Sequence, residues 1–99
     1  MLSDTRLYGT TYYGGNNNGY GTVFAVNTDG SGFTVLKAFT GGNDGANPEA
    51  GMVLSGTTLY GATGQGGSND FGTVFKVNTD GTGFTVLKNF TGSDGANPG

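Results

Sequence analysis

The feature that most constrains this chain is an internal repeat. Tyr20 to Gly41 reads YGTVFAVNTDGSGFTVLKAFTG and Phe71 to Gly92 reads FGTVFKVNTDGTGFTVLKNFTG, so 18 of 22 positions are identical at an offset of 51. The flanking strings LYG and DGANP also occur twice. A period of roughly 20 to 50 residues indicates stacked units, each of which needs neighbours to bury its apolar surface. We therefore expect two units, repeat 1 over residues 1–52 and repeat 2 over residues 53–99.

Each period contains four segments that are typical of β-strands. In the second period they are residues 52–54, 58–63, 72–77 and 84–90, which are short, rich in β-branched or aromatic residues and bounded by turn-forming residues. The strings NTDGSG (27–32) and NTDGTG (78–83) predict hairpin turns, because Asp bonds its own backbone and Gly accepts positive φ. No segment spaces apolar residues as a helix does. We predict an all-β fold without helices.

Four antiparallel strands in about 40 to 50 residues are the signature of a β-propeller blade. Each sheet has two half-apolar faces, and blades stacked around an axis cover both. Two blades cannot close a ring, so we predict a propeller completed by homo-oligomerisation, with a tetramer (eight blades) favoured over a trimer or a pentamer. A β-solenoid, an isolated sandwich and a fragment that does not fold are the alternatives.

The aromatic residues divide into two groups. The phenylalanines of the strand segments are expected in the core, namely Phe24, Phe33, Phe39, Phe75, Phe84 and Phe90. Three tyrosines flank the first loop rich in Gly and Asn, where rings can stack on sugars while amides bond hydroxyl groups. The candidate ligand-binding residues are Tyr12, Tyr13, Tyr20, Asn17 and Asn18. This gives an alternative function as a multivalent, lectin-like module for carbohydrate.

Few residues suit catalysis or metal binding. The chain has no His and no Cys, which excludes a Ser-His-Asp triad within it and the usual zinc ligands. A hydrolase with paired carboxylates is a further hypothesis, but almost all of the carboxylates lie beside Gly or Asn, where turns favour them. Calcium binding is an alternative for two equivalent Gly-containing loops. One loop alone supplies fewer than the six to eight oxygen ligands that calcium needs. Those candidate ligands are Asp44, Asn47, Asp94 and Asn97. We expect a non-catalytic protein without a cofactor.

Charge and hydropathy restrict the partners. Four basic residues and a net charge of −3 argue against nucleic acid, whose binding needs a Lys/Arg patch. No apolar run approaches the roughly 18 residues of a membrane helix. The N-terminal residues lack a basic region followed by an apolar stretch, so no signal peptide is expected. The expected partner is a second copy of the chain.

The strings LYGTTYYGG, GTVFAVNTDGSGFTVLKAFTG and DGANPEAGMVLSG resemble the GloVer-type tandem repeat of bacterial exported proteins. The resemblance covers essentially the whole chain. It implies a propeller-like array in large secreted or surface-anchored proteins, and it transfers no catalytic residue. This chain differs in having two repeats and no export signal or anchor, so the resemblance assigns an extracellular or surface location to the parent family and none to this chain.

Overall fold

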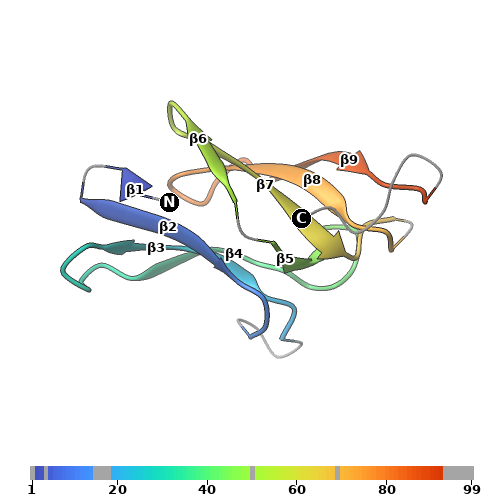
Figure 1. Cartoon of the computed structure of the whole chain (residues 1–99), viewed down its shortest axis with the longest axis horizontal. Coiled ribbons are helices and arrows are strands. Elements are labelled where there is room, and N and C mark those ends of the chain that lie inside the picture. Colours follow the sequence, from blue (N-terminus) through green and yellow to red (C-terminus); the bar gives the residue numbers. More distant parts are fainter. Residues whose placement is uncertain (1, 4, 15–18, 50, 69, 93–99) are drawn as a thin grey trace.

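Each repeat forms its own antiparallel sheet. The structure is a computed structural model that describes residues 2–3, 5–14, 19–49, 51–68 and 70–92. Within these residues every regular element is a β-strand and no helix occurs (Figure 1). The all-β prediction is confirmed.

The first sheet is a simple meander, and the second repeats it with one strand added. The first consists of β1 (Leu2–Ser3), β2 (Arg6–Thr11), β3 (Thr22–Asn27) and β4 (Thr34–Ala38), each paired with the next. The second consists of β6 (Val53–Ser55), β7 (Thr58–Gln65), β8 (Thr73–Asn78) and β9 (Thr85–Asn89). The extra strand β5 (Ala46–Pro48) also pairs with β7, so β5 and β6 share one edge of it.

The strand β5 was not among the predicted strands. The prediction of four strands per repeat is correct for the first sheet, whereas the second sheet has five strands. The segment has only three residues, Ala46, Asn47 and Pro48, and none of them is typical of a strand. Its backbone is also irregular, because Asn47 has a φ of 55°. Proline is tolerated there because β5 lies at the edge of the sheet, where no outer neighbour needs its N–H.

Both predicted hairpin turns are present and are built alike. The Asn27 N–H donates to the Ser31 carbonyl at 2.8 Å, and the Asn78 N–H donates to the Thr82 carbonyl at 2.9 Å. The carboxylate of Asp29 accepts the Ser31 N–H at 2.9 Å, as Asp80 accepts that of Thr82 at 3.0 Å. The hairpin turns of the two repeats therefore have the same local structure.

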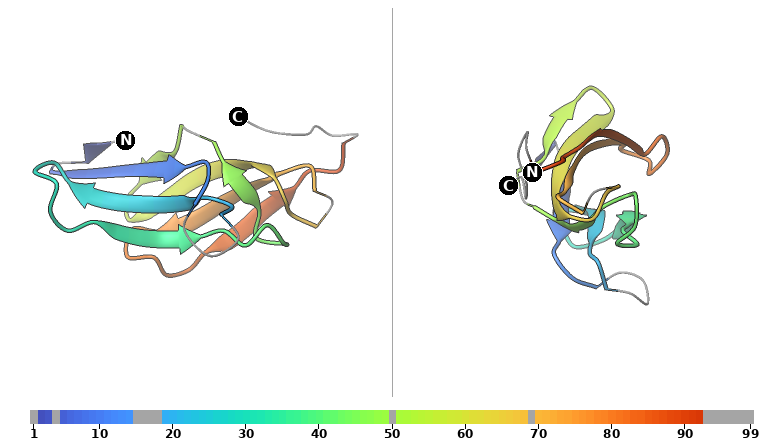
Figure 2. Two further views of the ribbon diagram at one scale, coloured as in Figure 1. Left: turned by 90° about the horizontal axis from the view of Figure 1, so that it is seen from below. Right: turned by 90° about the vertical axis from the view of Figure 1, so that its right-hand side faces the viewer.

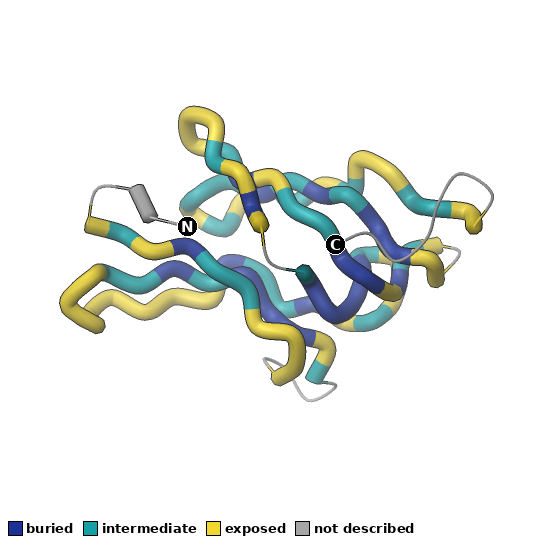
Figure 3. Tube along the Cα trace, viewed as in Figure 1, coloured by how far each residue is buried: buried dark blue, intermediate teal, exposed yellow. Residues whose placement is uncertain are grey.

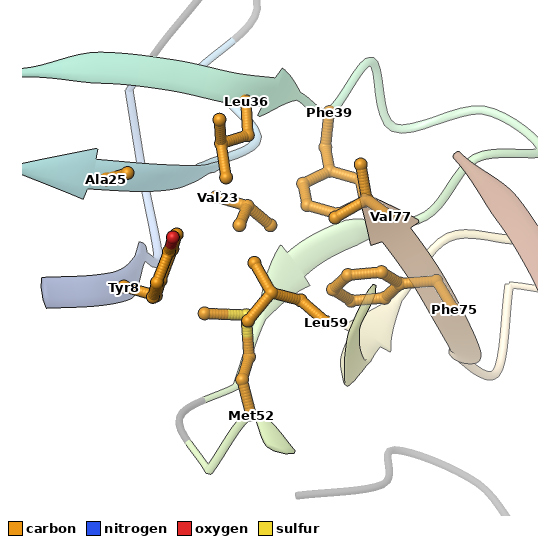
Figure 4. Packing of buried hydrophobic residues seen from close by; sticks show 9 residues of the cluster. All are labelled: Tyr8, Val23, Ala25, Leu36, Phe39, Met52, Leu59, Phe75 and Val77. Atoms are coloured by element: carbon orange, nitrogen blue, oxygen red, sulfur yellow. The ribbon is translucent and has the colours of Figure 1, made fainter. Parts of the chain in front are cut away.

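The core lies between the two sheets (Figure 2). Side chains of the first sheet face those of the second across it (Figure 4). The cluster contains Tyr8, Val23, Ala25, Leu36, Phe39, Met52, Leu59, Phe75 and Val77. Phe39 and Phe75 meet edge to face, with ring centroids 5.3 Å apart. The prediction that Phe33 is a core residue is wrong: it precedes β4 and is 61% exposed, because the sheet face that carries it has no neighbour.

Candidate interaction surface

The two faces of each sheet carry different side chains, and strand register decides which residues share a face. In the first sheet β2 and β3 pair Tyr8 with Ala25, while the adjacent pair Gly9 and Phe24 lies on the opposite face. Both sheets have a β-bulge at the same place, between Val23 and Phe24 and between Val74 and Phe75. The two faces are therefore equivalent from repeat to repeat.

We name these faces by their aromatic residues. The tyrosine face carries Tyr8, Val23, Ala25, Leu36 and Lys37 in repeat 1, and Tyr60, Val74, Lys76, Leu87 and Lys88 in repeat 2. The phenylalanine face carries Leu7, Phe24, Val26, Phe33 and Val35 in repeat 1, and Leu59, Phe75, Val77, Phe84 and Val86 in repeat 2.

The two repeats bury opposite faces. The tyrosine face of repeat 1 packs on the phenylalanine face of repeat 2, and together they form the core. The other two faces remain open: the phenylalanine face of repeat 1 exposes Leu7, Phe33 and Val35, and the tyrosine face of repeat 2 exposes Tyr60 and Leu87. Figure 3 shows buried stretches in both sheets, with exposed stretches at the hairpin turns and along other parts of the strands.

Identical residues show the contrast most directly. Leu36 is 8% exposed and its equivalent Leu87 is 50% exposed. Leu59 is fully buried, whereas its equivalent Leu7 is 39% exposed. Because each pair is the same amino acid in the same strand position, packing alone explains the difference. The open faces are apolar surfaces of the kind that mark interaction sites.

A lysine and an aspartate add a polar contact to the closed interface. The Lys37 ammonium lies 4.4 Å from the ring centroid of Phe84 in the other repeat and 3.0 Å from the carboxylate of Asp44. The Thr40 hydroxyl donates to the same carboxylate at 2.7 Å. Burial alone would raise the pKa of Asp44, but the hydrogen bonds from Thr40 and Lys37 and the lysine charge outweigh it, so the pKa is lowered.

The hairpin turn of repeat 2 also contacts repeat 1. A Cβ atom at Gly81 would lie 3.2 Å from the carbonyl oxygen of Leu36, so this turn rests against β4. The equivalent Gly30, with the same φ of 88°, would meet nothing within 4 Å. The turn of repeat 1 is thus open on the same side as its phenylalanine face.

The predicted ligand-binding tyrosines lie at one loop. Tyr12, Tyr13 and Tyr20 are exposed, and the first two rings meet edge to face with centroids 4.7 Å apart. The Tyr20 ring covers Gly41, where a Cβ atom would come within 2.6 Å of it. Asn17 and Asn18 lie outside the described residues. Carbohydrate binding stays a prediction.

The two candidate calcium ligands that the structure describes, Asp44 and Asn47, are engaged within the protein. Asp44 accepts hydrogen bonds as described above, and the buried Asn47 donates its side-chain amide to the Tyr12 carbonyl at 2.9 Å. Asp94 and Asn97 lie outside the described residues. In the part of the chain that the structure describes, no three acidic, His or Cys side chains come together as a metal site. Calcium binding stays the alternative to the expected absence of a cofactor.

Sequence comparison agrees with the repeated fold. The profile of the Gloeobacter/Verrucomicrobia repeat matches residues 1–99, which is the whole chain. The chain belongs to the Gloeobacter/Verrucomicrobia repeat family. This confirms the resemblance drawn from the repeated strings. No curated protein and no solved structure matches the chain. No described segment of this Gloeobacter/Verrucomicrobia repeat protein is a helix long and apolar enough to cross a membrane.

Several residues of the open faces were not singled out by sequence reasoning. Leu7, Val35 and Leu87 look like ordinary strand residues in both copies of the Gloeobacter/Verrucomicrobia repeat. The signal that could have found them is the alternation itself, because apolar residues occur on both faces of every strand pair. A sheet that is apolar on both faces needs two neighbours, and each sheet here has one.

Proposed function

We propose that this chain is a non-catalytic scaffold repeat whose copies associate front to back. The phenylalanine face of repeat 1 in one copy receives the tyrosine face of repeat 2 in the next. The observation that carries the proposal is the closed interface, which is made of the same two faces in the same orientation. The chain therefore contains one such interface, together with one open face of each kind that could form a second interface with other copies.

The open halves match the closed interface residue by residue. Leu87 would take the place that Leu36 holds against repeat 2, and Phe33 would take the place of Phe84. Lys88 would then lie over Phe33 of the neighbouring copy, as Lys37 lies over Phe84. Burial of apolar side chains supplies the driving force, and the lysine contact favours this orientation over its reverse.

The symmetry of such a contact has a structural consequence. Front-to-back interfaces are heterologous, and they produce a closed ring when the rotation between copies divides a full turn. Each sheet would then be one blade of a β-propeller, and the sheet faces would all be covered. A ring of four copies, with eight blades, is the assembly favoured here over three or five copies.

A charged residue distinguishes the open tyrosine face from the closed one. Lys76 occupies the position of Ala25, which is fully buried in the core. In an assembly the aliphatic stem of Lys76 can cover apolar surface while its ammonium reaches solvent at the rim. This costs affinity relative to alanine, so contacts between chains are weaker than the contact within the chain.

The test is the mass in solution, measured by light scattering after size exclusion at several concentrations. The wild-type chain should run as a discrete multiple of its 10.0 kDa. Phe33→Glu places a charge in the proposed contact and should give a folded monomer. Ser68→Glu, at an exposed position in the β7–β8 loop, is the matched control and should assemble like the wild type. A folded wild-type monomer at every concentration would overturn the proposal.

A further inference from the structure

The strand β5 joins the two repeats. It follows repeat 1 in the chain but pairs with β7 of repeat 2, with Ala46 opposite Gln65 and Pro48 opposite Thr63. The Glu49 N–H extends this pairing by donating to the Ala62 carbonyl at 2.9 Å. Asn47 holds the segment to repeat 1, because its backbone N–H donates to the Tyr20 carbonyl at 2.8 Å.

Among the residues that the structure describes, no such strand pairs with the equivalent edge of repeat 1. Residues 11–13 correspond to residues 63–65, and among the described residues β1 pairs only with Arg6 and Leu7 of β2. Thr63 is fully buried, but its equivalent Thr11 is exposed. Both threonines make the same hydroxyl bond to the next strand, at 2.7 Å to Thr73 and 2.8 Å to Thr22. The added strand β5 therefore accounts for the difference in burial.

Strand length reflects the same pairing. β7 has eight residues and continues through Gln65, whereas β2 has six and ends at Thr11. The two additional residues of β7 are those that run beside β5. In repeat 1 the corresponding Tyr12 and Tyr13 are bends with exposed side chains. A strand at this edge would extend β2 as β5 extends β7.

The sequence contains a second segment of the required kind. Residues 94–98 read DGANP, identical to residues 44–48, and they follow repeat 2 as those residues follow repeat 1. We infer that residues 96–98 of one copy add as a strand to the edge of β2 at residues 11–13 of a second copy. Added strands gain affinity from main-chain hydrogen bonds and alignment from the register of their side chains. The inference rests on the proposed front-to-back association and names a second contact within it.

Side-chain size at the edge fits this pairing. In repeat 2 the small Gly64 lies beside Glu49, with a Cβ atom at Gly64 coming 2.8 Å from the Glu49 carboxylate. In the inferred pairing Tyr12 replaces Gly64, and Gly99 replaces Glu49. In the first pairing the edge strand has the small residue and the added segment has the large one, and in the inferred pairing the reverse holds. One large side chain is therefore present at this position in both pairings.

Engineered cysteines test the inference, since the chain has none of its own. Ala96 and Tyr13 correspond to the directly opposed pair Ala46 and Gln65. Opposed residues of antiparallel strands lie about 4.5 to 5.5 Å apart, within reach of a disulfide. One chain carries Ala96→Cys and the other, with a size tag, carries Tyr13→Cys. The two are mixed and oxidised mildly, and the mixed dimer is measured on a non-reducing gel.

We expect the mixed dimer to form at least about tenfold faster than with Tyr12→Cys, because a shift of one residue turns the side chain to the other face. Ala46→Cys with Gln65→Cys in one chain is the matched control and should close within the monomer. Equal rates at positions 12 and 13, or a disulfide closing within a monomeric Tyr13→Cys/Ala96→Cys chain, would overturn the inference.

Light scattering on the same mixture separates the two proposals. Association without preferential cross-linking at position 13 would overturn the strand inference and leave the face-to-face contact standing. Absence of any association would overturn both.

Discussion

Tyr8 and Tyr60 hold the same place in two nearly identical sheets, yet Tyr8 is buried and Tyr60 is exposed. Their neighbours Leu7 and Leu59 show the reverse. The hairpin turns and the β-bulge are the same in both repeats. The difference is that each sheet has one neighbour, and the neighbour lies on opposite faces. Burial in this protein is therefore a property of stacking and is not determined by the sequence of one repeat.

The largest expected effect compares Phe75 with its equivalent Phe24. Phe75→Ala should lower the free energy of unfolding by about 3 to 5 kcal/mol, because it leaves a cavity in the closed interface. Phe24→Ala should cost about half of that or less, since Phe24 packs on Phe33 at a face open to water. Urea unfolding of dilute, monomeric protein measures both. Equal losses would mean that the two faces are equally covered.

Next in size is the comparison between Thr63 and Thr11. Thr63→Val removes the acceptor for the buried Thr73 N–H and should cost about 1 to 3 kcal/mol. Thr11→Val removes the same bond to the Thr22 N–H at an edge that water can reach, so its cost should stay below about 1 kcal/mol. Thermal unfolding under identical conditions gives both values. A Thr11 variant as unstable as the Thr63 variant would contradict an open β2 edge.

A smaller effect concerns association. Lys76→Ala gives the open tyrosine face the residue that Ala25 supplies in the closed one. Removing a charge that must stay hydrated should tighten association about fivefold, equivalent to about 1 kcal/mol. Sedimentation velocity across a concentration series measures the change. Lys76→Arg, which keeps the charge, is the control and should not tighten it. Weaker association of the alanine variant would mean that Lys76 makes a favourable contact.

The smallest effects are expected where the two repeats do not differ. The Ser31 hydroxyl and N–H lower the pKa of Asp29, and those of Thr82 lower the pKa of Asp80. A lowered pKa stabilises the folded state above the ordinary value of 3.8, and that stability is lost as pH falls through the folded pKa. The melting temperature should therefore hold near neutral pH and fall below about pH 4, in a pH series of melting curves. Asp29→Asn and Asp80→Asn should flatten this fall equally. A clear difference between them would show that the turns are not equivalent.

The strands and turns of both repeats could be predicted because they depend on local signals. Alternating β-branched residues mark the strands, and Asp-Gly with flanking Asn marks the hairpin turns. Both Phe33 and Phe84 are predicted core residues because they fall in strand segments, but only Phe84 packs against the core. The sequence of a repeat contains both apolar faces but not the information about which neighbour is absent.

Other features escaped prediction for different physical reasons. β5 has no strand composition and forms because the edge of β7 is available to it. The contact of Lys37 with Phe84 joins residues of different repeats, whose distance depends on how the sheets stack. At the predicted loop, the exposure of Tyr13 follows directly from its position beside Gly and Asn. Local sequence signals thus predict the loops and turns, whereas β5 and the contact between Lys37 and Phe84 depend on how the sheets stack.

The most direct test of front-to-back association mixes two chains, each blocked on a different face. Phe33→Glu blocks the phenylalanine face of repeat 1, and Leu87→Glu blocks the tyrosine face of repeat 2. Each variant alone should be a folded monomer by light scattering. An equimolar mixture should give a dimer of twice the 10.0 kDa chain mass, because one free face of each kind remains. A mixture that stays monomeric, or a single variant that assembles by itself, would contradict the account.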